Sequence, residues 1–230
     1  GSIASQVRAQ PSAGFSICTY SGSGSNGSFG HGLNAVPELV IVKCRSHSQN
    51  WAVQHSAYGP TKYTYLNSTN EARTTGAAAF WNNTAPTNST VSVGTDNDTN
   101  ASGKTYVAYC FAPVNSYSAM GSYTGSGSND GSYIFTGFAV KWVLIKCTSA
   151  AGQEWVILDS ARSPSNVVDD ALYANDYTAE ASNSTRDVDF LSNGFKLRNG
   201  SSGATDFSGR TYIYLAFASN PFASNGGLAR

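Results

Sequence analysis

Charged residues are scarce in this sequence, and neither sign is in excess. They make up 12% of the 230 residues, and the 14 lysines and arginines balance the 14 aspartates and glutamates. Proteins that bind nucleic acid or an anionic membrane surface through charge carry basic clusters, and no basic cluster longer than a pair occurs here. We therefore expect no nucleic acid among the partners of this chain.

Long apolar runs and cysteine pairs at metal-binding spacing are also missing. No apolar stretch approaches the roughly 18 residues that span a bilayer, so we expect no insertion into a membrane. No two of the four cysteines form a Cys-x-x-Cys motif, and all lie in apolar, strand-like segments. This pattern is typical of buried thiols in a protein made in a reducing cytosol. The four residues are Cys18, Cys44, Cys110 and Cys147.

Glycine, serine, threonine and asparagine are abundant, and they separate short runs rich in valine, isoleucine, tyrosine and phenylalanine. This composition is typical of an all-β protein with many turns. The only helical turn that we expect lies at residues 166–172. The expected strands are 14–20, 39–45, 50–55, 62–66, 89–93 and 104–111, then 118–123, 142–147, 154–158, 194–197 and 210–218.

The sequence repeats itself once. A shift of about 103 to 106 residues places "TYSGSGSNG" on "SYTGSGSNDG" and "SGKTYVAYCFA" on "SGRTYIYLAFA". Trp51 then falls on Trp155, and we expect both rings at equivalent places in a core. A repeat of about 100 residues is the size of one small domain rather than of a solenoid unit.

We therefore predict an all-β fold of two tandem β-sandwich repeats, of jelly-roll or lectin-like type, each of about 100 residues. A single merged core built from both repeats is the alternative. The predicted boundaries are 1–13 for a leader or linker, 14–114 for the first repeat, 115–222 for the second and 223–230 for a C-terminal tail.

Several blocks of the sequence together resemble a known family. They include "GHGL", "NWAVQHSA", "FWNNTAPTNS", "WVILDSARSPSNV" and "SGRTYIYLAFASNPF", and the likeness extends from Ala13 to Arg230. The chain resembles a domain that recurs in large virion proteins of tailed bacteriophages, especially phages of aquatic bacteria. The resemblance implies a virion location, in the phage tail, after assembly in the cytoplasm of the bacterial host. It supplies no catalytic residues.

The function that we expect is a tail or tail-fibre module that binds a glycan on the host cell surface. The alternative is a structural spacer or assembly module that contacts only other virion proteins; a homotrimer is open under both readings. A glycan depolymerase is the third possibility. Such an enzyme would need two carboxylates about 5 to 10 Å apart. The aspartates stand in turn-like sequence, and even the pair Asp187 and Asp189 is typical of a solvated strand end, so we expect no enzyme.

Glycan-binding proteins stack exposed aromatic rings on sugar faces and order the hydroxyls with nearby polar groups. The useful rings are those that the two repeats do not share: Trp81 aligns with Leu191, and Tyr58 aligns with Arg162. A packed or incidental surface ring is the competing reading for each. The candidates are Trp81 with Asn82 and Asn83, Tyr58, Tyr173 and Tyr177.

One segment suggests a metal site. In "DNDTNASGKTYV", Asp96, Asp98 and Asn100 alternate as oxygen ligands do in the first half of a calcium loop. The sixth and twelfth positions are Ala101 and Val107, so the closing bidentate carboxylate is missing. An Asx-rich turn is the competing reading. We expect no cofactor otherwise, and Ca²⁺ is the one ion that the sequence leaves open.

Overall fold

The computed structural model describes residues 1–182 and 185–221. In these residues the chain consists of strands joined by turns, with one α-helix, α1 (Ala77–Trp81), and two 3₁₀ turns, η1 (Pro11–Ala13) and η2 (Ser56–Tyr58). The predicted all-β class is confirmed. Among these residues no helix has the length and apolar character that crossing a membrane requires. The predicted tail at 223–230 lies outside the described residues.

The chain divides into two compact units. Unit 1 comprises residues 1–67 and 72–113, and unit 2 comprises residues 68–71 and 114–230. Each unit contains one large antiparallel sheet and a smaller sheet whose inner residues share its core. The four cysteines are buried free thiols, as predicted.

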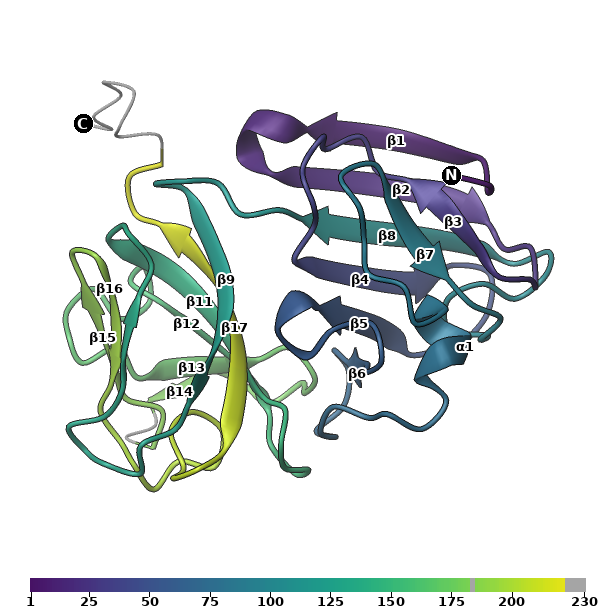
Figure 1. The fold of residues 1–230 in the computed structure, drawn as a ribbon. Coiled ribbons are helices and arrows are strands. Elements are labelled where there is room, and N and C mark those ends of the chain that lie inside the picture. Colours follow the sequence, from purple (N-terminus) through teal and green to yellow (C-terminus); the bar gives the residue numbers. More distant parts are fainter. Residues whose placement is uncertain (183–184, 222–230) are drawn as a thin grey trace. The chain divides into compact units, whose positions relative to one another are not determined.

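The large sheet of unit 1 has the strand order β1-β2-β8-β4-β5-β6, which can be followed from top to bottom in Figure 1. Its strands are β1 (Ser5–Gln10), β2 (Phe15–Ser21), β8 (Thr105–Phe111), β4 (Leu39–Cys44), β5 (Trp51–His55) and β6 (Thr64–Tyr65). The segment expected to be a leader contains β1, which pairs with β2 from Ser5 opposite Tyr20 to Gln10 opposite Phe15. It is therefore an edge strand of the sheet rather than a leader.

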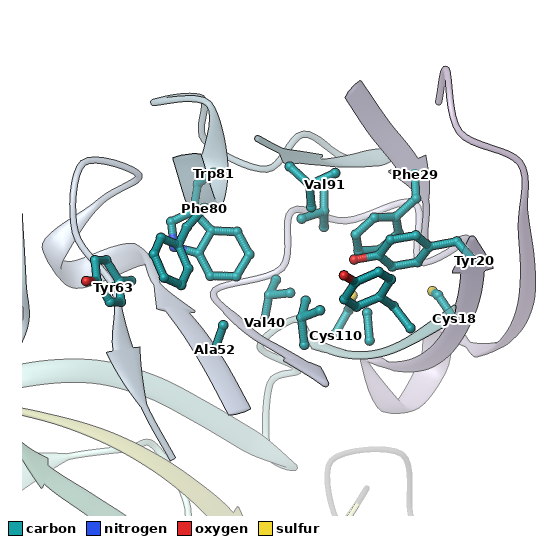
Figure 2. Packing of buried hydrophobic residues seen from close by; sticks show 14 of the residues in the cluster. Cys18, Tyr20, Phe29, Val40, Ala52, Tyr63, Phe80, Trp81, Val91 and Cys110 are labelled. Carbon is teal, nitrogen blue, oxygen red and sulfur yellow. The ribbon is translucent and has the colours of Figure 1, made fainter. Parts of the chain in front are cut away.

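The core of unit 1 lies between this sheet and a layer made of β3 (Gly27–Gly30), β7 (Thr90–Val93) and α1. Figure 2 shows Phe29 and Val91 from this layer facing Tyr20 from β2. The rings of Tyr20 and Phe29 are stacked with their centroids 4.6 Å apart. The alternation of buried and exposed residues along β2 and β8 places one face of each strand in this core.

The large sheet of unit 2 has the order β9-β17-β11-β12-β13-β14. These strands are β9 (Ser118–Thr124), β17 (Thr211–Ala218), β11 (Val140–Cys147), β12 (Trp155–Asp159), β13 (Asp170–Tyr173) and β14 (Ala181–Ser182). A second sheet, β10-β16-β15, contains β10 (Tyr133–Phe135), β16 (Gly194–Leu197) and β15 (Val188–Leu191). The order β9-β17-β11-β12-β13 in this sheet corresponds, strand for strand, to the order β2-β8-β4-β5-β6 in the large sheet of unit 1.

Two expectations about local structure were wrong. The helical turn expected at 166–172 is instead extended: Val168 bridges Val188, and β13 begins at Asp170, because Val168 and Ala171 are buried in the core of unit 2. Trp51 was expected to be buried like Trp155, but its ring is only partly buried.

Candidate functional site

The prediction that the Trp81 ring is exposed and could bind a glycan is wrong. Trp81 is 0% exposed and belongs to the core of unit 1, where Figure 2 shows it beside Phe80. The reason is α1, which turns Phe80 and Trp81 toward the large sheet. Phe80 in turn stacks on Tyr63 with ring centroids 3.8 Å apart. The indole is therefore a packing element and has no free face for a sugar.

Asn82 and Asn83 end this helix. Both residues have left-handed backbone angles, with φ of 51° and 47°, and the Asn82 N–H donates to the Ala78 carbonyl at 2.9 Å. Asparagine adopts this conformation more readily than other non-glycine residues, so the pair acts as a helix C-cap. The alanine run followed by two asparagines was the sequence signal for this short helix, which is absent from the elements expected from the sequence.

Tyr58 and Arg162 align in sequence, and the structure gives them the same task. The Tyr58 hydroxyl donates to the Val53 carbonyl at 2.9 Å, and the Arg162 guanidinium donates to the Ile157 carbonyl at 3.2 Å. Val53 on β5 and Ile157 on β12 occupy matching positions. Tyr58 is therefore tied to the backbone of its own unit, and burial raises the pKa of its hydroxyl far above the ordinary value.

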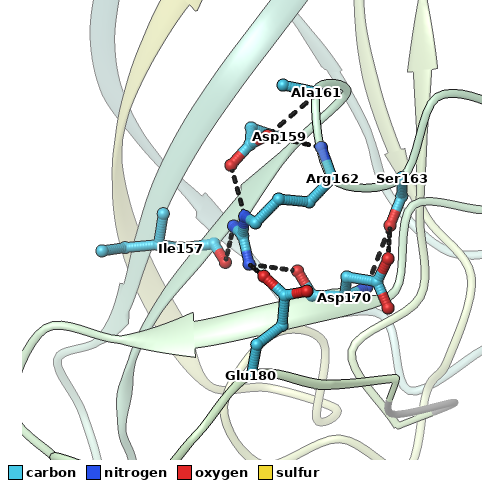
Figure 3. A network of polar contacts seen from close by, with 7 residues as sticks. All are labelled: Ile157, Asp159, Ala161, Arg162, Ser163, Asp170 and Glu180. Atoms are coloured by element: carbon cyan, nitrogen blue, oxygen red, sulfur yellow. Dashed lines mark hydrogen bonds and ion pairs between the residues drawn. The ribbon is translucent and has the colours of Figure 1, made fainter.

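Arg162 is the centre of the polar network in Figure 3. Its Nε donates to Asp159 at 2.7 Å, and its Nη1 donates to the Asp170 carbonyl at 2.8 Å and to Glu180 at 3.1 Å. Burial alone would raise the pKa of Asp159, but hydrogen bonds from Arg162 and from the Ala161 N–H outweigh it and lower that pKa. Arg162 thus ties the turn after β12 to β13 and to the segment that contains Glu180.

The two remaining tyrosine candidates differ in exposure. Tyr173 lies in β13, half-buried, with the Arg186 guanidinium 5.9 Å from its ring centre. Tyr177 is fully exposed, at 101%, in the segment between β13 and β14. Tyr177 is thus the one sequence-predicted ring whose faces are open to solvent.

The oxygens proposed for calcium are engaged with the chain itself. Asp96 accepts the Asp98 N–H at 2.8 Å, and Asp98 accepts the Asn50 N–H at 2.8 Å. Asn100 is fully buried; its Oδ1 accepts the Ser23 N–H at 2.8 Å, and its Nδ2 donates to the carbonyls of Ser25 and Gly94. Among the described residues, no group of three or more His, Cys, Asp or Glu side chains is placed to hold a metal.

Asn100 also explains why the glycine-serine turn occurs twice. In unit 2 its position is taken by Asp206, which is fully buried and whose Oδ1 accepts the Ser126 N–H at 2.8 Å. In each unit one buried side chain therefore fixes the turn that follows the first repeated strand. The "DNDTN" segment is the unit 1 version of this anchor, which favours the Asx-turn reading over the metal reading.

Two rings that are not among the sequence-based candidates form the most exposed aromatic surface among the described residues apart from Tyr177. Tyr133 and Phe135 on β10 are 45% and 66% exposed, and Ile134 between them is buried. They therefore project from the same outer face of β10, about 7 Å apart along the strand. We call Tyr133 and Phe135 the aromatic platform.

A glycine on the neighbouring strand lets that strand pack closely against β10 beside the platform. Gly194 on β16 is opposite Phe135, and a side chain there would meet the Ile134 carbonyl at 2.1 Å and the Tyr133 ring at 3.1 Å. The Tyr133 hydroxyl donates to the Asn193 carbonyl at 3.3 Å, which restrains its ring.

Charged side chains border the platform in balanced pairs. Lys196, opposite Tyr133, contacts Asp130 at 2.5 Å, and Arg198 lies 3.2 Å from Asp130 and 3.4 Å from Asp189. The hydrogen bond from Lys196 lowers the pKa of Asp130, so the carboxylate stays ionised at neutral pH. The two positive charges and the two negative charges largely cancel, so the electrostatic field at the platform is weak. Such an environment suits an uncharged ligand.

The acids considered for a depolymerase lie at the edge of the same small sheet. Asp189 is in β15 opposite Lys196, and the Arg198 N–H donates to the Asp187 carbonyl. Burial raises the pKa of Asp187, and the charges of Asp169 and Asp189 raise it further.

The platform exists in unit 2 alone. Phe29 and Ile134 are the buried central residues of β3 and β10, so Ser28 and Gly30 of unit 1 correspond to Tyr133 and Phe135. The sequence signal was present: "SYIFTG" aligns with "GSFGHG", and the two outward residues of that short alternation are rings in the second repeat only.

The fold and these surfaces describe an all-β protein with paired antiparallel sheets in each of two units. The chain belongs to the DUF7483 family, described as a domain of unknown function, which matches residues 1–221. No curated protein and no solved structure matches the chain.

Proposed function

We propose that this chain is a non-catalytic binding module of a bacteriophage virion, within a tail or tail-fibre protein, and that it recognises an uncharged glycan on the host cell surface. The observation that carries the proposal is the aromatic platform. Exposed rings beside restrained polar groups are the usual means of holding a sugar ring. The sequence resemblance to virion proteins of tailed phages supports the location, with other virion proteins as further partners.

We also propose that units 1 and 2 are tandem β-sandwich repeats of one ancestral domain, of jelly-roll or lectin-like type. Matching strand orders support this, as do the paired hydrogen bonds of Asn100 with Asp206 and of Tyr58 with Arg162. Duplication explains the platform: the core is retained in both repeats, and the outer face of one is free to change.

The test is a glycan array with the purified chain, followed by adsorption of the chain to host cells. The double variant Tyr133→Ala, Phe135→Ala should lose the glycans that the parent chain binds, whereas Tyr177→Ala, which removes a more exposed ring elsewhere in unit 2, should keep them. A double variant that binds and adsorbs like the parent would refute the platform. If the parent chain itself binds no glycan, the spacer reading replaces the proposal.

The same array distinguishes a depolymerase. Products of a bound glycan would be sought by mass spectrometry after prolonged incubation with the parent chain and with Asp187→Asn. Cleavage that this substitution abolishes would overturn the non-catalytic part of the proposal while leaving recognition intact.

A further inference from the structure

Unit 1 contains a small apolar cavity of 170 Å³ at one end of its core. Its walls come from the segment before β4, from the turn after β5 and from the segment after α1. Most of the lining side chains are apolar: Val36, Pro37, Val40, Pro60, Ala85 and Pro86. A cavity of this size has room for several water-sized groups.

Gln54 lies in this cavity without a partner. Its side chain is 3% exposed, and neither its carboxamide oxygen nor its carboxamide nitrogen has a hydrogen-bond partner among the described residues. Gln54 is opposite Val40, a core residue, so its side chain is on the core face of the sheet. An unpaired buried amide is costly, and native proteins contain few of them.

The equivalent position in unit 2 carries no polar group. Val40 opposite Gln54 corresponds to Val143 opposite Leu158, and Leu158 is fully buried in the core. The fold therefore accepts an aliphatic residue here at no cost in polar burial. The glutamine of unit 1 is not required by the architecture, so a ligand is the simplest account of an unpaired amide at this position.

We infer that this cavity binds a small uncharged group that carries a carboxamide, with the ligand amide paired side by side with the amide of Gln54. A primary carboxamide offers one acceptor and one donor in the same plane, which are the two partners that Gln54 lacks. The proline and valine side chains would cover the aliphatic part of the ligand. Binding sites of this kind are mostly apolar, with few polar groups that fix the orientation.

The cavity shares no residue with the aromatic platform, so this inference stands apart from the proposed function. The ligand amide has two sources: a free small amide, or the side chain of a glutamine or asparagine in a partner protein. Both present the same chemistry to Gln54.

The experiment is a titration of the ¹⁵N-labelled chain followed by NMR, with the side-chain NH₂ resonances of Gln54 as the reporter. Butyramide is the probe, pentan-2-one is its isostere with an acceptor but no donor, and butyrate is its charged counterpart. We expect butyramide to shift the Gln54 resonances in a saturable manner and to bind about tenfold more tightly than pentan-2-one. Butyrate should bind more weakly still, because binding would bury its charge and the cavity lining includes the carboxyl group of Glu38.

Gln54→Met keeps the length of the side chain and removes the amide, and Gln54→Leu reproduces the residue of unit 2. Both substitutions should reduce the affinity for butyramide about tenfold or more, as measured by the shifts of the backbone amide resonances of Val40 and His55. The control variant Tyr133→Ala, Phe135→Ala should bind butyramide with the affinity of the parent chain. Tighter binding of N-acetylglutamine methylamide than of butyramide would assign the ligand to a protein side chain; equal binding would assign it to a free amide. Absence of any shift at Gln54, or unchanged affinity in Gln54→Met, would overturn the inference.

Discussion

Replacing Gln54 by leucine should stabilise unit 1, although it alters a buried residue. The two carboxamide atoms are buried and unpaired, and leaving such groups without partners costs about 1 to 3 kcal/mol. Leucine removes that cost and adds apolar contact with Val40, while Leu158 demonstrates that a leucine fits at the equivalent place. We expect Gln54→Leu to raise the free energy of unfolding of unit 1 by about 1 to 3 kcal/mol.

The measurement must report on unit 1 alone, because a chain of two units need not unfold in a single step. Hydrogen exchange of the slowest backbone amides in β4 and β5 gives the local unfolding free energy of this sheet. In a thermal scan the transition of unit 1 should rise by about 4 to 8 °C for each kcal/mol gained.

The matched control is the reverse change in unit 2. Leu158→Gln introduces an unpaired amide into a packed core and should destabilise unit 2 by about 2 to 4 kcal/mol. If Gln54→Leu destabilised unit 1 by a similar amount, the amide of Gln54 would be satisfied in the free protein, and the reasoning from its unpaired state would fail.

Three further predictions concern the residues that the structure assigns to the core and the turns. Trp81→Ala should destabilise unit 1 by about 3 to 5 kcal/mol, measured by denaturant titration, because it empties a fully buried site; a loss below about 1 kcal/mol would contradict its burial. Asn100→Ala should lower the free energy of unfolding of unit 1 by about 1 to 3 kcal/mol and speed amide hydrogen exchange in the turn at Ser23. Addition of Ca²⁺ should change the melting temperature of neither the parent nor the variant. A calcium-dependent rise in melting temperature would restore the interpretation as a metal site. The pKa of Asp159 is lowered in the folded chain, so its contribution to stability should be complete above the unfolded pKa of about 3.9 and be lost as the pH falls through the folded pKa. Asp159→Asn should therefore be less stable than the parent at pH 6, and the difference should shrink as the pH falls through the folded pKa; a constant difference would contradict the role of the Arg162 contact.

Features that depend on neighbouring residues along the chain could be predicted from the sequence. Alternating apolar residues specify strands, and runs of glycine, serine and asparagine specify turns, so the all-β class and most strands of the large sheets followed directly. Burial of the cysteines followed because each lies inside an apolar strand segment. Residues 166–172 were misread because the local pattern is weak there, and the burial of Val168 and Ala171 decides the conformation.

Exposure of single rings could not be predicted, because it depends on which segment packs across the sheet. Trp81 and Tyr133 both stand next to turn residues in sequence, yet the short helix α1 turns Trp81 into a core while the edge strand β10 turns Tyr133 outward. The unpaired state of Gln54 could not be predicted either, since nothing in "WAVQHSA" indicates whether its side-chain amide has a hydrogen-bond partner. The sequence alone thus determined the strands and the repeat through local chemistry. The pairing of layers in the tertiary structure decided which side chains are buried, which are presented to solvent, and which buried polar groups, the Gln54 amide among them, are left without a partner in the described residues.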